Sequence, residues 1–379
     1  MKRAYWILII IITFTAGCIT GSFFSSNTNM DDIKNNGQNP QSTKTVEQKK
    51  KPKIIQPKSN VIMGYVQDFR DPDEIDYRPL SHVIFSFAHP MKDGSIHLNG
   101  ETALNHLRAV VEKAKKHDTK VLLAVGGWFH LNGGESYEYF KEAIAQSTSR
   151  TKLVKELIAL IEKESIDGID IDFEHPRSDE DAAYLNALMK ELSIELQPID
   201  KELSIAVHSK IHSQSGTELG MVVYDPLMFQ YVDHVNIMAY DGQWDGGYEA
   251  ANLSPYPFVE NIVDYWSNLF DEHGYPREKL VLGVPFYAQP EDPNSKQVSY
   301  AALINDNPKN SLKDTVNMNG TIYHYNGEAT MQKKTEVSLN HGFGGMMLWE
   351  MGLDAKGSNS LTAAISEVIQ SKDTSLQDN

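Results

Sequence analysis

A short acidic segment near the middle of the chain carries the residue types that acid–base chemistry needs. It reads Asp-Gly-Ile-Asp-Ile-Asp-Phe-Glu over residues 167–174. Side chains of an extended strand alternate between two faces, so Asp170, Asp172 and Glu174 would share one face. Carboxylates about 6–7 Å apart in a confined space cannot all ionise, so at least one would keep its proton near neutral pH. Glu174, the last of the row, is the natural general acid.

The opposite face of the same segment is apolar. Ile169, Ile171 and Phe173 would pack under surrounding helices, which leaves the acidic row pointing away from them. A row neutralised by Arg or Lys partners, or by a divalent cation, is the structural alternative. Calcium takes six to eight oxygens, usually from a loop, and a strand offers too few in the wrong arrangement. We therefore expect a catalytic row without a metal.

Eight short apolar runs beyond residue 60 predict the strands that position this row. Segments with helical periodicity lie between them, such as Leu153–Ile161 and Phe258–Leu269, and Ser178 with Asp181 forms a helix start. Parallel strands need crossover helices, so this alternation predicts an α/β fold, a closed (β/α)8 TIM barrel. The expected strands are Val61–Val66, His82–Ala88, Val121–Gly126, Gly168–Phe173, Leu203–His208, His234–Tyr240, Leu280–Tyr287 and Gly344–Trp349.

The sequence around these strands favours a closed barrel over an open sheet. An open doubly wound sheet would need a glycine-rich phosphate loop after the first strand, and none follows Gly64-Tyr65-Val66. In a barrel the C-terminal strand ends face the catalytic mouth. The longest interval between strands, 288–343, separates strands seven and eight. It is expected to hold one helix and a short insertion around Thr321–Tyr325.

Composition excludes several classes of protein. The chain has 379 residues, of which 41% are hydrophobic and 23% charged, which excludes a polytopic membrane protein, a collagen and a wholly disordered chain. Residues 1–60 carry a net charge of +6 and the remainder −22, which together give −16. A domain this acidic repels phosphate backbones, which predicts a neutral ligand and no nucleic-acid partner. We also expect a monomer. The single cysteine, Cys18, excludes an internal disulfide and a cysteine-based zinc site.

The N-terminal residues have the pattern of an export signal. Lys2 and Arg3 precede an apolar run that ends at Gly17-Cys18. Residues 15–18 resemble a bacterial lipobox, with Thr15 where Leu is usual, which would place diacylglycerol on Cys18. An uncleaved membrane anchor is the alternative, and both place the chain outside the membrane. We expect residues 1–24 to be this signal or anchor, 25–58 a flexible linker, 59–372 the barrel and 373–379 a tail.

The acidic segment resembles the D-G-x-D-x-D-x-E signature of glycoside hydrolase family 18, the chitinases and related β-N-acetylglucosaminidases. Further segments resemble this family in the same order along the chain, and the resemblance covers roughly residues 60–370. They are Val125–Trp128, with Ala124 where the family usually has Ser, then Met238–Asp241, Gly283–Tyr287 and Gly345–Trp349.

The resemblance implies a mechanism and roles for named residues. In this family the N-acetyl carbonyl of the substrate itself attacks the anomeric carbon, and the reaction retains configuration. Glu174 would protonate the leaving oxygen, Asp172 would orient the acetamido group, and Asp170 would tune Asp172. Tyr240 would bind the acetamido carbonyl, and Asp241 would contact the sugar. No cofactor is implied.

The resemblance also implies sugar-binding positions. Trp349 would form the floor of the −1 subsite, because a flat indole packs on the C–H face of a pyranose. Phe87 is expected to face the barrel lumen. His208 could bind the ligand, but we favour a hydrogen-bonded residue at the barrel mouth. Met238 and Gly127, which lie in segments that resemble the family, are further substrate-binding positions. The weaker candidates, for which a core or surface role is as good an explanation, are Tyr65, Phe87, Trp128, Tyr287 and Trp244.

Three functions follow from these observations. The first is hydrolysis of β-1,4-linked N-acetylglucosamine polymers such as chitin, with endo cleavage in a shallow cleft because the insertion is short. The second is an endo-β-N-acetylglucosaminidase acting on peptidoglycan or N-glycans. The third is an inactive chitin-binding protein, which the presence of Glu174 disfavours.

Overall fold

The computed structural model describes residues 60–377, apart from 175, 214, 216, 221 and 243–247, with side chains described as far as residue 372. The expected export signal with Cys18, the linker and Trp244 lie outside the described residues. Within the described ranges, no helix combines the length and apolar character needed to cross a membrane.

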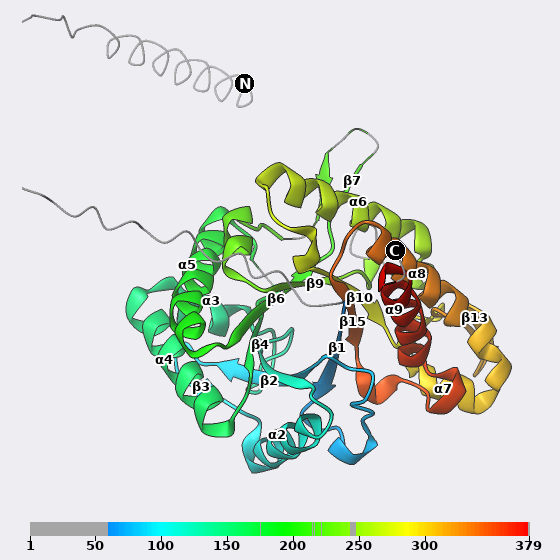
Figure 1. The fold of residues 1–379 in the computed structure, drawn as a ribbon, viewed down its shortest axis with the longest axis horizontal. Helices are drawn as coiled ribbons and strands as arrows, with labels where there is room; N and C mark the ends of the chain where they lie inside the picture. Colours follow the sequence, from blue (N-terminus) through cyan, green and yellow to red (C-terminus); the bar gives the residue numbers. More distant parts are fainter. Residues whose placement is uncertain are drawn as a thin grey trace, which may run out of the picture. The chain divides into compact units, whose positions relative to one another are not determined.

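Eight parallel strands form a closed ring with helices outside it (Figure 1). The strand order is β1-β15-β10-β9-β6-β5-β4-β2, and pairing of β1 with β2 closes the ring. The predicted (β/α)8 barrel is thus confirmed, and each predicted strand overlaps an observed one. The strands are β1 Val61–Gln67, β2 His82–Pro90, β4 Lys120–Gly126, β5 Gly168–Asp172, β6 Glu202–His208, β9 His234–Met238, β10 Leu280–Pro285 and β15 Gly345–Trp349.

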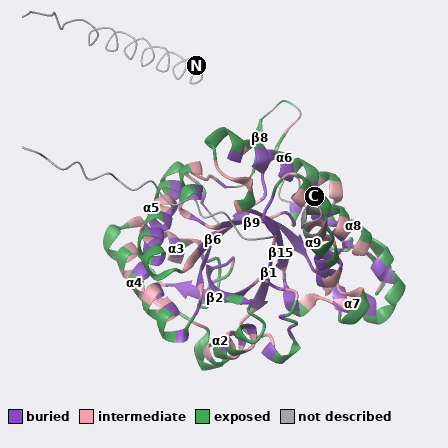
Figure 2. Ribbon diagram, in the orientation of Figure 1, coloured by how far each residue is buried: buried purple, intermediate pink, exposed green. Residues whose placement is uncertain are grey.

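The helices bury one face against the outside of this ring and expose the other (Figure 2). In α4 the buried face includes Leu153, Leu157 and Ile161, which follow helical spacing. Helix α5 begins as predicted, because the Ser178 hydroxyl accepts a hydrogen bond from the Asp181 amide at 3.2 Å. The helices of the barrel are α2 Gly100–Lys115, α3 Tyr137–Ala145, α4 Ser147–Glu164, α5 Asp179–Leu196, α6 Tyr256–His273, α8 Glu328–Asn340 and α9 Leu361–Gln377.

Each strand separates an outer core from an inner one. Ile169, Ile171 and Phe173 of the β5 segment belong to the large core between strands and helices. A smaller cluster fills the lumen and includes Tyr65 and Ile84. The alternation predicted for β5 therefore holds, and its acidic face is left for the lumen.

The segment between β10 and β15 contains more structure than the sequence predicted. Two helices, α7 Tyr300–Asp306 and α8, replace the single expected one. A four-stranded antiparallel sheet has the order β12-β11-β14-β13. Its hairpin turns at Asn319-Gly320, both with positive φ, which is the usual sequence pattern of a two-residue hairpin. The strands are β11 Tyr287–Pro290, β12 Val298–Ser299, β13 Thr315–Met318 and β14 Thr321–His324.

Three further short strands lie outside the ring. Strand β3, Ile96–His97, pairs antiparallel with the end of β2. The other two, β7 Ile211–His212 and β8 Glu218–Leu219, form a hairpin between β6 and β9.

Candidate active site

The acidic row of β5 begins inside the barrel lumen and ends at its mouth. The Asp170 side chain is fully buried and Asp172 is 3% exposed, while Glu174 lies two residues beyond the end of the strand. The extended course of residues 168–172, on which the predicted alternation depended, is confirmed.

Asp170 is held by three hydrogen-bond donors from three other strands. The Tyr65 hydroxyl donates to Oδ2 at 2.6 Å, and Asn236 Nδ2 donates to Oδ1 at 3.1 Å. The Ser204 hydroxyl also donates to Oδ1. Burial raises the pKa of Asp170, and these hydrogen bonds act against that rise. Sequence reasoning missed Ser204 and Asn236, although both have the inward parity of their strands.

Asp172 is in a less satisfied environment. Its Oδ1 is buried and has no hydrogen-bond partner among the described residues. Burial raises its pKa well above the usual value, and the charges of Glu174 and Asp170 add to the rise. A carboxyl with these neighbours retains a proton, because a second negative charge in the same lumen is unfavourable.

Glu174 has the perturbed acidity that a general acid requires. Burial raises its pKa to about 8, with a further contribution from the charge of Asp241, while a hydrogen bond with the Trp128 backbone acts in the opposite direction. The charge of Glu174 in turn helps to raise the pKa of Asp172, so the two carboxyls do not both ionise readily near neutral pH. At neutral pH the pair can therefore donate a proton at the barrel mouth.

His208 lies beside this pair without neutralising it. Its Nε2 is 3.7 Å from Glu174 Oε2, and burial lowers its pKa to about 4. The ring is therefore neutral near pH 7, and it meets Trp128 edge-on at a centroid distance of 6.5 Å. The His208 amide donates to the Tyr224 hydroxyl at 2.9 Å, a residue that sequence reasoning did not select.

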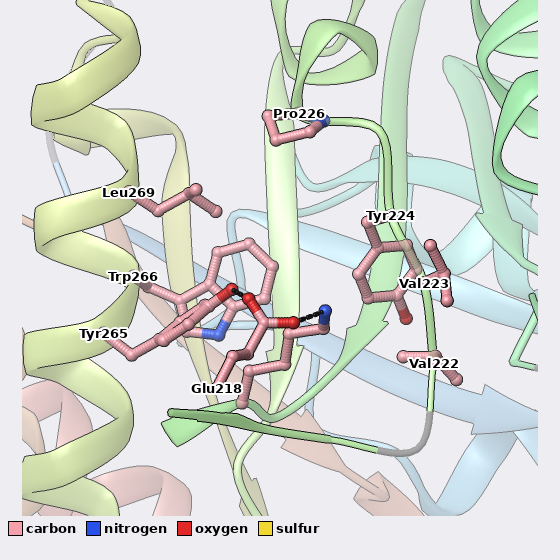
Figure 3. Close-up of a pocket in the computed structure, with 9 residues that line it drawn as sticks. Glu218, Val222, Val223, Tyr224, Pro226, Tyr265, Trp266 and Leu269 are labelled. Carbon is pink, nitrogen blue, oxygen red and sulfur yellow. Dashed lines mark hydrogen bonds and ion pairs between the residues drawn. The ribbon is translucent and has the colours of Figure 1, made fainter. Parts of the chain in front are cut away.

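A small cavity lies behind Tyr224, between the β7–β8 hairpin and α6 (Figure 3). It has a volume of about 130 Å³, and its polar groups pair with one another. Glu218 binds Lys210 at 2.5 Å and accepts a hydrogen bond from the Tyr265 hydroxyl at 2.5 Å. Lys210 Nζ in turn lies 5.5 Å from the centroid of the Tyr224 ring. The ion pair therefore lies beside the ring whose hydroxyl accepts the His208 amide hydrogen bond.

The end of β9 brings Tyr240 and Asp241 to the same region. Burial raises the pKa of Tyr240 well above its usual value, and the charge of Asp172 is the second largest cause of the rise. The Tyr240 hydroxyl lies 3.8 Å from Met347 Sδ. Asp241 Oδ1 accepts hydrogen bonds from the Tyr287 hydroxyl at 2.7 Å and from Gln289 Nε2 at 3.0 Å. Burial raises the pKa of Asp241, and the Tyr287 bond opposes that rise. Gln289 is a further residue that the sequence did not reveal.

Two glycines at the end of β4 allow close approach to β5. Gly126 and Gly127 have φ values of 118° and 80°, and the Gly127 amide donates to the Asp172 carbonyl at 2.9 Å. A Cβ on Gly126 would lie 2.2 Å from that carbonyl oxygen, and one on Gly127 would lie 2.9 Å from the Phe87 ring. Only glycine can adopt a positive φ easily and also leave out the Cβ for which these positions have no room.

Aromatic side chains line the mouth beside the acidic row. The half-buried Trp349 ring lies 5.4 Å from Tyr65 and 6.0 Å from Phe87, measured between centroids. Phe87 and the half-buried Met238 also pack against the lumen cluster. Phe85 instead lies in the outer core, although it has the same parity as Phe87. The pairing of β2 with β4 shifts register between Phe85 and Ala88, which turns Phe87 inward.

Trp349 is fixed by its backbone neighbours. Its carbonyl accepts a hydrogen bond from the Phe286 amide at 2.8 Å. The next residue, Glu350, is 1% exposed and forms an ion pair with Arg70. Its second oxygen accepts from the Gly352 amide at 3.0 Å. The indole is therefore presented by a rigid turn.

Comparison with known proteins identifies the family. The model described as glycosyl hydrolases family 18 matches residues 61–354. Endochitinase 1 of Metarhizium robertsii is 22% identical over 80% of this chain and 82% of that protein. Chitinase 1 of Aphanocladium album is 23% identical over 82% and 84%.

Solved structures have the same fold. The GH18 chitinase from the chitin utilization locus of Flavobacterium johnsoniae has a TM-score of 0.69 at 23% identity, covering 83% of this chain and 96% of that one. A chitinase from Bacteroides thetaiotaomicron has a TM-score of 0.69 at 22% identity, covering 83% and 98%. The family match spans most of the barrel, including the acidic row and its aromatic surroundings. The chain therefore belongs to glycosyl hydrolase family 18 and is a glycoside hydrolase.

Proposed function

We propose that this protein hydrolyses β-1,4-linked N-acetylglucosamine chains, with chitin or chitooligosaccharides as substrate, by a retaining, substrate-assisted reaction. The observation that carries the proposal is the acidic row of β5, whose last member, Glu174, lies at the barrel mouth beyond the buried Asp170 and Asp172. Burial there raises the pKa of Glu174 to about 8. Relatives along the barrel are named as chitinases, and a chitinase domain of Ostrinia furnacalis was solved in complex with (NAG)5.

The first step breaks the glycosidic bond. Glu174 donates its proton to the glycosidic oxygen, and the acetamido carbonyl oxygen of the sugar forms a bond to the anomeric carbon as the leaving sugar departs. The product is a cyclic oxazolinium ion. Asp172 orients the acetamido group by accepting its N–H, and the Tyr240 hydroxyl hydrogen-bonds the acetamido oxygen.

The second step restores the acid. Glu174, now ionised, takes a proton from water as the water oxygen bonds to the anomeric carbon and the oxazolinium ring opens. Two inversions at one carbon give net retention. Asp172 is a poor alternative nucleophile, because burial and its two acidic neighbours favour its neutral form.

The aromatic and polar groups of the mouth supply the sugar site. Trp349 forms the floor under the reacting sugar, while Tyr65 and Phe87 pack against its indole. Asp241, aligned by Tyr287, contacts the sugar nearby. Met238, Gly127 and Trp128 complete the surface around Glu174.

A substrate comparison tests the neighbouring-group step. Chitooligosaccharides should be cleaved with retention, whereas matched β-1,4-glucose oligomers, which lack the 2-acetamido group, should not be cleaved. Equal cleavage of both series would contradict substrate assistance.

A second candidate function, an endo-β-N-acetylglucosaminidase acting on peptidoglycan or N-glycans, differs from the first in its physiological polymer. An N-terminal signal with Cys18 would tether the barrel outside the membrane, where a bacterial enzyme meets peptidoglycan first. Products from chitin oligomers, peptidoglycan and N-glycans, measured side by side at early times, decide among these substrates and between endo and exo cleavage. Binding of chitin without product from any polymer would favour the third candidate, an inactive lectin-like protein.

We also propose that Cys18 carries diacylglycerol and anchors the protein at the outer side of the cell membrane. The basic and apolar residues before a sole cysteine support this proposal. Incorporation of labelled fatty acid into the wild type and into Cys18→Ser tests it. The wild type should carry the label and the variant should not, whereas an unlabelled wild type would contradict lipidation.

A further inference from the structure

Two histidines and a glutamate meet at the N-terminal end of the barrel, opposite the catalytic mouth. His82 is the first residue of β2, Glu202 the first of β6 and His234 the first of β9. One potential ligand atom from each lies within 4.8 Å of the other two. We propose that these three side chains bind a divalent transition-metal ion of the zinc class, at a site separate from catalysis.

The distances are close to those of a three-ligand zinc site. His82 Nε2 lies 2.9 Å from Glu202 Oε2, and His234 Nε2 lies 4.0 Å from the same oxygen. Tetrahedral zinc binds nitrogen and oxygen ligands at about 2.0–2.2 Å, which separates the ligand atoms by about 3.3 Å. Small side-chain rotations therefore bring the three atoms around one ion and leave its fourth position open for water.

Ser81 can hold His82 in the tautomer that a metal-bound ring needs. The Ser81 hydroxyl accepts from the Ile62 amide at 2.9 Å, and it lies 3.1 Å from the Ile62 carbonyl and 2.8 Å from His82 Nδ1. With an ion at Nε2, Nδ1–H would donate to this hydroxyl, which would donate to the Ile62 carbonyl. Without an ion, the hydroxyl can donate to Nδ1 and Nε2–H can donate to Glu202 Oε2 at 2.9 Å, so the same contacts serve both states. A hydrogen bond from the ring nitrogen that does not bind the metal is typical of metal-bound histidines.

His234 supplies the second imidazole without losing other contacts. It is 5% exposed, and its Nδ1 is buried with no hydrogen-bond partner among the described residues. No hydrogen bond therefore fixes this ring in its present rotamer. Its ring meets that of His82 edge-on, with centroids 5.3 Å apart. A rotation toward Glu202 brings Nε2 to the ion.

Two lysines near the site oppose a cation and set the expected strength of binding. Lys120 contacts Glu202 through Oε1, the oxygen that the ion does not need, and its side chain is 52% exposed. It can turn into solvent when the ion binds. Lys279 donates to the Phe229 carbonyl at 3.1 Å. We therefore expect saturable binding that is weaker than at a zinc site without nearby cations.

The ion would join three strands that lie far apart in the sequence. It would bind the folded barrel and not the unfolded chain, so the melting temperature would rise with the logarithm of its free concentration once that exceeds the dissociation constant. Asp170 and its donors lie between this site and Glu174, so no catalytic step passes through the ion.

The experiment uses the full chain, stripped with a chelator and with Cys18 alkylated so that its thiol does not bind the ion. Calorimetry with Zn²⁺ and absorption spectra with Co²⁺ measure stoichiometry and coordination. We expect one ion per chain, the visible bands of a four-coordinate cobalt site and a higher melting temperature. His234→Gln and Glu202→Gln should abolish this binding, and Ser81→Ala should weaken it about 10- to 100-fold.

His89→Gln is the matched control, because His89 and His130 form another buried histidine pair, with ring centroids 5.5 Å apart. Zinc binding by this variant should equal that of the wild type. Circular dichroism and glycosidase activity without metal establish that each variant is folded. The proposal is overturned if the folded wild type shows no saturable binding, or if both folded ligand variants bind as the wild type does.

Discussion

The Tyr65 hydroxyl donates to Asp170 Oδ2 at 2.6 Å across the barrel lumen, which joins the first strand to the acidic strand. This bond holds the innermost carboxyl in place, and the carboxyl in turn adds its charge to the environment of Asp172. The acidity at the mouth therefore depends on a residue that need not touch the sugar.

Tyr65→Phe tests this relationship. Loss of a hydrogen bond to a charged group costs about 1.5–3 kcal/mol, so we expect kcat to fall about 10- to 100-fold with a smaller change in KM. Tyr77→Phe is the control, because its buried hydroxyl donates to the Pro72 carbonyl at 3.0 Å. That variant should lose stability and keep its kcat. Equal activity of Tyr65→Phe and wild type would remove Tyr65 from the catalytic network.

Glu174→Gln should abolish hydrolysis while leaving oligosaccharide binding intact. The amide has nearly the shape of the acid and cannot donate the proton, and general acid catalysis is worth about 10²- to 10⁴-fold. Turnover of a chitooligosaccharide and calorimetric binding measure the two effects separately. Residual activity within tenfold of wild type would contradict the assignment of the acid.

The pH dependence of kcat/KM should reflect the proton held by Glu174. Its pKa of about 8 predicts activity that falls as the pH rises through this value, because the acid form is lost. Asp241→Asn should move this limb to lower pH, since it removes a charge that raises the Glu174 pKa. Gln289→Leu, which removes a hydrogen bond to Asp241 and keeps the charge, should leave the midpoint nearly in place. An unchanged midpoint in Asp241→Asn would exclude this charge as a cause.

Lys334 predicts a pH dependence of stability. Burial lowers its pKa to about 7, and its Nζ donates to the Ser254 carbonyl at 2.5 Å and to Asn326 Oδ1 at 2.6 Å. The usual value is 10.5, so between pH 7 and 10.5 the unfolded chain binds a proton that the folded protein lacks. The free energy of unfolding should therefore rise with pH in this window, by at most about 1.4 kcal/mol per pH unit from this group.

Urea denaturation of wild type and Lys334→Met at pH 7, 8 and 9 measures this slope. The variant should show a smaller rise than the wild type. The exposed Lys92→Met serves as control and should keep the wild-type slope over the same range. Parallel curves for wild type and Lys334→Met would mean that the buried amine titrates normally.

Gly127→Ala should impair the site more than its backbone strain alone explains. Both Gly127 and Gly133 have positive φ, 80° and 88°, and an alanine in this region costs about 1–2 kcal/mol. Only at Gly127 would the new Cβ meet Phe87, at 2.9 Å, whereas nothing lies within 4 Å at Gly133. Unfolding and turnover of the two variants should diverge, with activity lost only in Gly127→Ala. A similar loss in both would assign the effect to strain.

The sequence alone determined the eight strands, the inward acidic row of β5 and the family resemblance. These features depend on local patterns, because strand alternation has a period of two and the motif lies within eight residues. For the same reason Ser178 could be recognised as the start of α5. The short strands of the insertion carried too weak an alternation to be recognised, although Asn319-Gly320 is a hairpin pattern.

The tertiary structure decided what depends on register between strands and on exclusion of water. Sequence alternation gives Phe85 and Phe87 the same parity, and only the shifted pairing of β2 with β4 separates them. Ser204 and Asn236 reach Asp170 because β6 and β9 are neighbours of β5 or of each other in the ring. His82 and Glu202 are 120 residues apart and meet only because the strands curve into a closed barrel. The raised pKa of Glu174 has the same origin, since burial by distant segments is its largest cause.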